Sequence, residues 1–301
     1  MNQTDRTLES KSEAQKTEEE TFRRLLLGID LQNDFCHPEG KLAVKGAKED
    51  LERIINLIEV GGEHFNEVII SMDSHYPLHI AHPSFWRNQA GEMPEPFTII
   101  TYDEVIKNKW IPQYYQEQVQ SADYQCTIWP PHCLIGTEGW ALPEALCFTL
   151  SQWSHQKGRN FELYNKGSNP FTEHYSILQA AVPFREYPAT CLDQTLLQRF
   201  STFDEIIIVG EAMDFCVANT IDDILKNAPH IMRKMVILTD CMSSIIPENS
   251  GCIVGSPFPA NVITSNGASS SFKEMSLSFN ASFTFSRVGS LVRVLTFSLK
   301  P

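Results

Sequence analysis

The chain has 301 residues, of which 42% are hydrophobic and 20% are charged, so it can bury a sizeable core. This composition excludes a chain that is disordered throughout, and it also excludes collagen-like and coiled-coil proteins. The formal net charge of −13 makes nucleic acid an unfavourable partner, because an acidic surface repels a phosphate backbone.

Three sequence features bear on where the protein works. No run approaches about 18 apolar residues, so we expect no membrane-spanning segment and no membrane partner. Residues 1–22 are polar and lack the features of a secretory signal, which predicts a disordered tail and a cytoplasmic protein. The eight cysteines include no CxxC pair, and we expect reduced thiols rather than a disulfide framework.

Short apolar segments alternate along the chain with longer segments of helical spacing. Residues 47–58 illustrate the second kind, because the isoleucines and leucines there recur on one helix face. Continuous apolar strands that alternate with helices indicate a parallel sheet covered on both faces. Strands are predicted at 24–31, 67–72, 161–164, 205–210 and 235–239. Helices are predicted at 47–58, 113–120, 142–152, 194–200 and 215–226.

The alternation ends near residue 247. Beyond it the chain is rich in Ser, Asn and Gly and holds one further candidate strand, at 291–297. We therefore predict a disordered tail at 1–22 and an atypical segment, partly irregular or disordered, at 248–301. Between them, residues 23–247 are predicted to form a single three-layer α/β/α domain of Rossmann-like type, with a mostly parallel, roughly six-stranded sheet.

Polar residues follow the predicted strands, and the carboxyl ends of parallel strands are where sites form. Cys216 begins a predicted helix, where the helix N-terminus lowers a thiol pKa and favours a nucleophilic thiolate. Asp30 could exchange a proton with that thiol, and the charge of Lys166 would favour the thiolate. Taken singly, each has a commoner interpretation: a buried core cysteine, a hydrogen-bond acceptor and a solvated lysine.

A second group of polar residues has the composition of a metal site. Asp73 and His75 are two residues apart at a strand end, and His132 is a candidate third ligand. His79 and His82 lie close by in the sequence. The alternative is that these histidines are surface or turn residues.

Several segments together resemble the isochorismatase-like cysteine hydrolases and, within them, the nicotinamidases. The segments GIDLQNDF, NKGSNPFTEHYS and GEAMDFCVANT match the three catalytic motifs, and they occur in the family's order. Asp-x-His together with W-P-x-H-C matches the nicotinamidase metal motif, and HCLIGTEG matches a further run. The joint match overturns the separate structural interpretations, and it implies the isochorismatase-like hydrolase fold.

The resemblance also assigns roles to individual residues. It implies one divalent metal ion, with zinc expected first and iron or manganese left open. It further implies a non-proline cis peptide bond at Ala212–Met213. The residues are Asp30, Lys166 and Cys216 for catalysis; Asp73, His75 and His132 for the metal; the backbone N–H groups of Met213 and Cys216 for the oxyanion; and Phe35, Trp86 and Phe215 for the substrate ring, with core packing as the alternative for these aromatics.

The function implied is that of a nicotinamidase, which hydrolyses nicotinamide to nicotinic acid and ammonia through a cysteine thioester, in NAD salvage. Three alternatives stay open: a hydrolase of the same superfamily acting on another small amide, a non-catalytic member acting as a binding protein, and a hydrolase that uses metal-bound water. The small molecule nicotinamide is the expected partner, and a homo-oligomer is left open.

Overall fold

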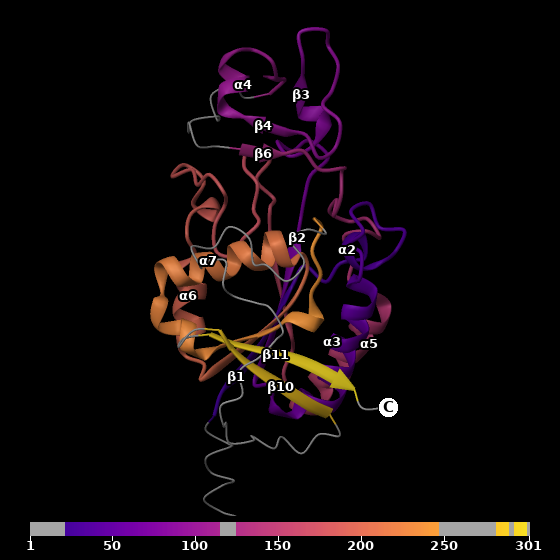
Figure 1. Ribbon diagram of the computed structural model, residues 1–301, viewed down its shortest axis with the longest axis vertical. Helices are drawn as coiled ribbons and strands as arrows, with labels where there is room; N and C mark the ends of the chain where they lie inside the picture. Colours follow the sequence, from indigo (N-terminus) through magenta and orange to yellow (C-terminus); the bar gives the residue numbers. More distant parts are fainter. Residues whose placement is uncertain (1–21, 115–124, 247–280, 289–291, 300–301) are drawn as a thin grey trace, which may run out of the picture.

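The computed structural model describes residues 22–114, 125–246, 281–288 and 292–299. Its centre is a seven-stranded sheet in the order β10-β11-β9-β8-β1-β2-β7 (Figure 1). The strands are β1 (Arg24–Ile29), β2 (Glu67–Asp73), β7 (Glu162–Lys166), β8 (Glu205–Gly210), β9 (Met235–Leu238), β10 (Ala281–Val288) and β11 (Val292–Leu299). All neighbours pair in parallel except β10 and β11, which are antiparallel. The predicted mostly parallel sheet is confirmed.

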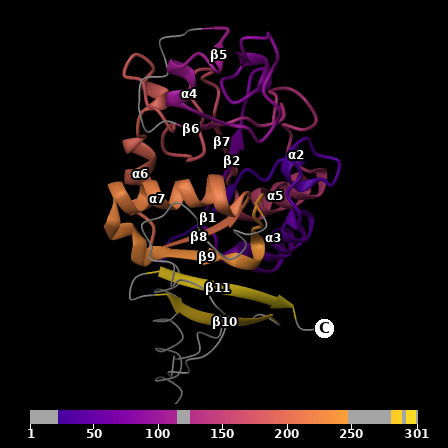
Figure 2. The ribbon, with the colours of Figure 1, turned by 45° about the horizontal axis from the view of Figure 1, so that its top comes forward.

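Helices cover both faces of this sheet, which confirms the predicted three-layer α/β/α arrangement. Helices α3 (Ala47–Gly61) and α5 (Glu144–Lys157) lie on one side (Figures 1 and 2). Helices α6 (Gln194–Ser201) and α7 (Ala218–Asn227) lie on the other. No helix of the described segments is long and apolar enough to cross a membrane.

Smaller elements gather beyond the end of β2, at one end of the molecule (Figures 1 and 2). They include two two-stranded sheets, which pair β3 with β5 and β4 with β6. The elements in this region are β3 (Trp86–Arg87), β4 (Ile99–Thr101), α4 (Tyr102–Ile106), β5 (Ile111–Pro112) and β6 (Gln125–Thr127). Short helical turns elsewhere are α2 (Asn33–Cys36), η1 (Gly62–His64), η2 (Pro83–Phe85), η4 (Pro188–Thr190), η5 (Met213–Val217), η6 (Pro229–Lys234) and η7 (Thr239–Cys241).

The alternation of side chains along β1 explains why its sequence is continuously apolar. Leu26 packs with the buried residues of α3 and α5, whereas Leu25 and Leu27 pack with those of α6 and α7. Successive residues of a strand point to opposite faces, so a strand between two helical layers is apolar at every position.

Five of the seven strands lie between residues 24 and 238, and the C-terminal part of the chain supplies the other two. β11 occupies the segment where the sequence predicts a strand at 291–297, and it pairs in parallel with β9. β10 has no counterpart in the sequence-based prediction. The predicted tail at 1–22 and the helix predicted at 113–120 lie almost entirely outside the described residues.

The register of the central strands brings four strand ends to one edge. Asp73 at the end of β2 pairs with Lys166 at the end of β7, and Ile29 of β1 pairs with Gly210 of β8. Gly210 has a φ of +115°, and a Cβ atom at this position would lie 2.1 Å from the carbonyl oxygen of Ile29. Only glycine allows β8 to end this close to β1.

Candidate active site

The three predicted catalytic side chains meet around one ammonium group. Lys166 Nζ lies 2.9 Å from Asp30 Oδ2 and 3.6 Å from Cys216 Sγ. All three residues are buried. They come from the ends of β1 and β7 and from the turn η5 that follows β8, so the parallel sheet itself brings them together.

Four further contacts fix this group. Lys166 Nζ also contacts Asp73 Oδ1 at 3.1 Å and donates to the carbonyl oxygen of His174 at 2.7 Å. The hydroxyl of Ser71 donates to Asp30 Oδ1 at 2.6 Å, while the backbone N–H of Asp30 donates to the Ser71 oxygen at 3.0 Å. The ammonium and the Asp30 carboxylate are therefore held by neighbours on both sides.

Burial and neighbouring charges set the protonation states in this group. Burial raises the pKa of Asp30, and Lys166 opposes this effect. Burial by itself would lower the pKa of Lys166, but Asp30 and Asp73 outweigh it and raise this pKa well above the usual range. Lys166 therefore stays charged.

The thiol behaves differently from the sequence-based expectation. Burial raises the pKa of Cys216 well above the usual value, although Lys166 opposes the increase. The expectation of a pKa lowered by the helix N-terminus is therefore wrong, because Cys216 lies in the buried turn η5 that precedes α7. In the resting site the thiol is protonated, and the ammonium group of Lys166 lies 3.6 Å from its sulfur.

Two residues of the GIDLQNDF segment place parts of the site without taking part in this group. Gln32 accepts from the backbone N–H of Asp73 at 2.7 Å and donates to the carbonyl oxygen of the same residue at 2.7 Å. Asp34 accepts from the backbone N–H of Cys133, next to His132, at 2.6 Å. Sequence reasoning quotes both residues as part of a motif but assigns them no role.

The predicted metal ligands lie together beside this group. Asp73 Oδ2 is 3.2 Å from His132 Nε2 and 3.5 Å from His75 Nδ1. Burial raises the pKa of Asp73, but His75 and Lys166 outweigh it and hold this pKa well below the usual range. Burial alone would lower the pKa of His75, but Asp73 and Glu173 raise it to about 9.

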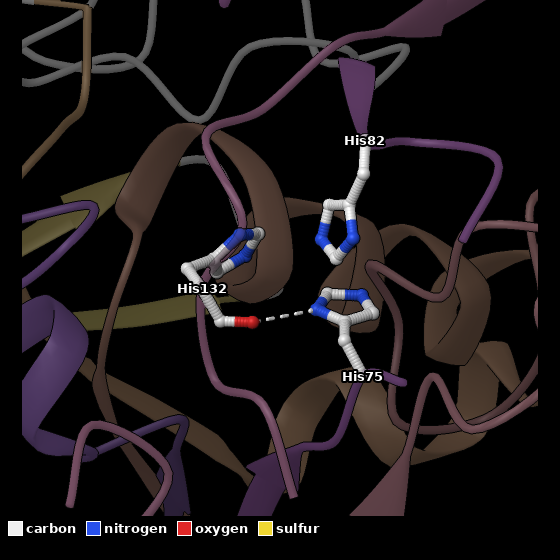
Figure 3. Close-up of side chains that lie close together, drawn as sticks. All are labelled: His75, His82 and His132. Atoms are coloured by element: carbon white, nitrogen blue, oxygen red, sulfur yellow. Dashed lines mark hydrogen bonds between the residues drawn. The ribbon is translucent and has the colours of Figure 1, made fainter. Parts of the chain in front are cut away.

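Other histidines extend this cluster. Among the described residues, two groups of buried side chains could hold a metal ion, and His75 belongs to both: one adds His82 and His132, and the other adds His79 and Glu173. Figure 3 shows the first group, with three imidazole rings facing a common space. Burial lowers the pKa of His82 to about 4, so this ring is neutral at neutral pH, as a metal ligand must be. From the sequence, His82 is identified only as a histidine near the predicted ligands.

A small cavity of about 20 Å³ opens onto Cys216 and the histidine cluster. An aromatic wall forms part of it: the Phe215 ring packs at 4.9 Å from Trp129 and 5.5 Å from Tyr175, measured between centroids. Phe35 and Phe215, both predicted to contact the substrate ring, line the cavity. The residues lining it are Phe35, Leu42, Asp73, Trp129, His132, Glu173, His174, Tyr175, Ala212, Phe215, Cys216 and Ile245.

Trp86, the third aromatic predicted to contact the ring, is not brought to this cavity. It is fully buried in β3, and its indole N–H donates to the carbonyl oxygen of Ile80 at 2.6 Å. Trp129 and Tyr175 line the cavity in its place. Both lie in segments already singled out, W-P-x-H-C and NKGSNPFTEHYS, but no pattern distinguishes them from core residues.

Two details of the turn before Cys216 also differ from expectation. The backbone N–H of Met213 donates to the carbonyl oxygen of Ser243 at 2.8 Å, so it is not free to bind an oxyanion. The cis peptide bond lies at Glu211–Ala212, one residue before the expected position at Ala212–Met213. Ala212 lines the cavity together with Cys216.

Comparison with known proteins gives consistent results. The nicotinamidase of Escherichia coli (strain K12) is 33% identical over 229 residues, which span 75% of this chain and 87% of the relative. The nicotinamidase of Acinetobacter baylyi is 31% identical over 218 residues, spanning 72% of this chain and 79% of the relative. No protein-family model matches the chain.

Solved structures share the fold. The yeast nicotinamidase Pnc1p bound to the inhibitor nicotinaldehyde superimposes with a TM-score of 0.57 at 22% identity, covering 76% of this chain and 93% of that one. A mostly parallel sheet carries an aspartate, a lysine and a cysteine at one edge, which is what the resemblance to the isochorismatase-like cysteine hydrolases implies. Within this class, the identity to the bacterial relatives shows that the chain belongs to the nicotinamidase family.

Proposed function

We propose that the protein is a nicotinamidase, which hydrolyses nicotinamide to nicotinic acid and ammonia through a thioester on Cys216. The observation that carries this proposal is the contact of Lys166 Nζ with both Asp30 Oδ2 (2.9 Å) and Cys216 Sγ (3.6 Å), next to the cavity that Cys216 lines. A base and a nucleophile that share one buried cation are arranged for acyl transfer.

The first half of the reaction forms the thioester. Asp30 takes the proton from the Cys216 thiol, and Lys166 stabilises the resulting negative charge on sulfur. The sulfur attacks the carboxamide carbon and gives a tetrahedral intermediate. Asp30 then returns the proton to the amide nitrogen, the C–N bond breaks, and ammonia leaves.

The second half regenerates the thiol. Asp30, again unprotonated, takes a proton from a water molecule, and the oxygen of that water attacks the thioester carbon. The C–S bond breaks, nicotinic acid is released, and Cys216 recovers its proton from Asp30. One carboxylate is thus base and acid in each half.

The oxyanion of the tetrahedral intermediate needs two N–H donors. We assign them to the backbone N–H groups of Ala212 and Cys216. Ala212 replaces Met213 in this role because the Met213 N–H is engaged by Ser243 and because Ala212 lines the cavity.

Asp73, His75 and His132 would hold one divalent metal ion, with His82 as a fourth ligand. Their fit is supported by the Nε2 atom of His82, which is buried and lacks a hydrogen-bond partner within the described residues. Three imidazoles and one carboxylate form a donor set that suits zinc, and iron or manganese also accept it. When bound, the ion would coordinate the pyridine nitrogen of nicotinamide and orient the ring.

The aromatic wall supports the same substrate. Phe35 lies 5.4 Å from His132, measured between ring centroids, and Phe215 lies between Trp129 and Tyr175. A flat heteroaromatic ring fits between such side chains better than an aliphatic amide does. These contacts would place the carboxamide over Cys216.

We further propose that the protein is cytoplasmic. The seven cysteines in the described part of the chain form no disulfide, which suits a reducing compartment. Every residue in this mechanism falls within the domain predicted at 23–247.

Ammonia release from nicotinamide tests the function directly. The wild-type protein should release ammonia and nicotinic acid in equal amounts, and iodoacetamide should block this by alkylating Cys216. Cys216→Ala should lower the rate by several orders of magnitude, while the exposed Cys147→Ala serves as the control.

The alternatives make different predictions in the same assay. A hydrolase that uses metal-bound water would keep most of its activity in Cys216→Ala. A hydrolase of another small amide would be inactive on nicotinamide but active on a different amide, and a binding protein would bind nicotinamide without turnover.

A further inference from the structure

The segment of residues 243–246 lies against the turn that carries Cys216, and no step of the mechanism above uses it. The carbonyl oxygen of Ser243 accepts the backbone N–H of Met213 at 2.8 Å. The backbone N–H of Ser243 in turn donates to Glu211 Oε2 at 3.0 Å. Two hydrogen bonds thus join the first residue of this segment to the chain just before the nucleophile.

Asp214 joins the other end of the 243–246 segment to the same turn. Its Oδ1 atom accepts the backbone N–H of Ile245, and its Oδ2 atom accepts that of Ile246, both at 3.0 Å. Asp214 is 5% exposed and lies in η5, two residues before Cys216. A buried carboxylate that accepts two consecutive backbone N–H groups fixes the position of both residues relative to the turn.

Ile245 is the residue of this segment that reaches the cavity. It packs against the apolar cluster that contains Phe35 and Leu42, and all three residues line the cavity. Ile246, which is held by the same carboxylate, is 40% exposed and is not among the lining residues. The cavity measures only about 20 Å³, so a side chain in its wall limits the size of the ring that can approach Cys216.

We propose that Asp214 is a positioning residue that holds the 243–246 segment against the nucleophile turn, so that Ile245 limits the size of the amides that reach Cys216. The substrate class in this proposal rests on the proposed function, whereas the size limit concerns the cavity alone. Asp214 acts on the reaction through Ile245 and not by contact with the substrate. An unsubstituted ring such as that of nicotinamide is accepted, and a ring with an added methyl group is selected against.

Alkylation of Cys216 measures access to the cavity without reference to turnover. Iodoacetamide is compared with the bulkier aromatic reagent iodoacetanilide, and mass spectrometry of the peptides follows the rates at Cys216 and at the exposed Cys147. The ratio of the two rates at Cys147 gives the intrinsic reactivity of the reagents. Because both reagents need the same thiolate, the ratio at Cys216 reports the size of the cavity rather than the pKa of the thiol.

Ile245→Ala enlarges the cavity and tests the size limit. It should raise the relative rate of iodoacetanilide at Cys216 by about tenfold or more, since one methylene group in an apolar pocket changes discrimination by about 10–200-fold. Ile246→Ala is the matched control, because its side chain lies outside the cavity lining, and its ratio should equal that of wild type. An unchanged ratio in Ile245→Ala would overturn the inference, as would an equal change in the control.

Asp214→Ala tests the positioning role, because it removes both acceptors and no longer holds Ile245 in the cavity wall. It should raise the same ratio, and the double variant with Ile245→Ala should give the ratio of Ile245→Ala alone. Effects that add in the double variant would overturn the positioning role. So would an equal loss of rate for both reagents in Asp214→Ala, which indicates a structural role alone. If Asp214→Ala does not fold, Asp214→Asn takes its place, since it keeps the size and one acceptor, and its ratio should rise by a smaller amount; an unchanged ratio counts equally against the proposal.

Hydrolysis of two amides separates this proposal from the proposed function. In Ile245→Ala and Asp214→Ala, kcat/KM for a ring-methylated nicotinamide should rise relative to that for nicotinamide. If neither amide is hydrolysed by any variant or by wild type while the alkylation ratios change as expected, the proposed function fails alone. If wild type hydrolyses nicotinamide while the alkylation ratios of the variants stay at the wild-type value, the positioning by Asp214 fails alone.

Discussion

Replacing Lys166 by methionine isolates the charge that holds the active site together, because methionine keeps a long apolar chain and removes only the ammonium. Lys166 is 3% exposed, and its Nζ contacts Asp30 at 2.9 Å and Asp73 at 3.1 Å. Removing one partner of a buried ion pair leaves the other charge uncompensated and costs about 3–5 kcal/mol. We expect the free energy of unfolding to fall by about this amount at pH 7.5.

The loss should become smaller as the pH falls. In the variant, Asp30 keeps its burial but loses the Lys166 charge, so its pKa, already raised, rises further. An acid with a raised pKa in the folded state destabilises the fold above its unfolded pKa, and this effect disappears as the pH falls through the folded pKa. In wild type, the lowered pKa of Asp73 contributes stability that is complete above its unfolded pKa and is lost only at much lower pH.

Urea unfolding followed by far-ultraviolet circular dichroism at pH 7.5 and pH 5.5 measures both effects. Lys48→Met is the control, since it removes an exposed lysine whose contact with Glu52 at 4.0 Å contributes about 0–1 kcal/mol. A loss in Lys166→Met no larger than that of the control would refute the reasoning. So would a loss that grows as the pH falls.

Three further predictions follow from the same geometry. Asp30→Asn should lower turnover by about 10²–10⁴-fold or more, and it should slow alkylation of Cys216 at neutral pH, because the thiol loses its proton acceptor; unchanged alkylation would argue against this pair. Removing the metal by chelation should raise KM for nicotinamide more than it lowers kcat, because the ion orients the ring; unchanged kinetics in a verified metal-free protein would remove the ion from the mechanism. Gly210→Ala should destabilise the fold in urea by more than the about 1–3 kcal/mol expected for backbone strain alone, because its Cβ would meet the Ile29 carbonyl oxygen. Gly136→Ala, with a φ of +85° and open space, measures that strain, and an equal loss in the two variants would contradict the clash.

The placement of Asp30, Lys166 and Cys216 could be predicted because it depends on the strands alone. Asp30 and Cys216 follow buried apolar strands, Lys166 ends the outermost strand β7, and these parallel strands end on the same side of the sheet. The family motifs then select these three among all residues at that edge. The sequence spacing does not show that the Cys216 thiol is buried. This burial reverses the direction of the Cys216 pKa shift.

Other features depend on contacts between segments far apart in the sequence. The Met213 N–H is engaged by the carbonyl oxygen of Ser243, thirty residues later, and nothing in the segment GEAMDFC indicates that bond. Trp86 comes shortly after His79 and His82, which belong to the histidine cluster. Its indole N–H nevertheless donates to the carbonyl oxygen of Ile80, away from the cavity. Among the described residues, β10 pairs with β11 alone, at the edge of the sheet.

The choice between His79 and His82 illustrates the same limit at the level of single atoms. The two residues have the same side chain, are three positions apart and are both buried, so the sequence gives no reason to prefer either as a ligand. A backbone N–H reaches the ring of His79, whereas a backbone carbonyl reaches that of His82. The backbone group next to each ring therefore determines which ring nitrogen keeps its lone pair.

The polar residues of GIDLQNDF show how one short segment organises a site made from four strand ends. Asp30 supplies the proton acceptor, Gln32 holds the backbone of Asp73, and Asp34 holds the backbone beside His132. Each is buried, so an unsatisfied partner would cost about 1–3 kcal/mol. The same three side chains therefore couple the nucleophile and the metal ligands to β1, and a displacement of this strand end would disturb both at once.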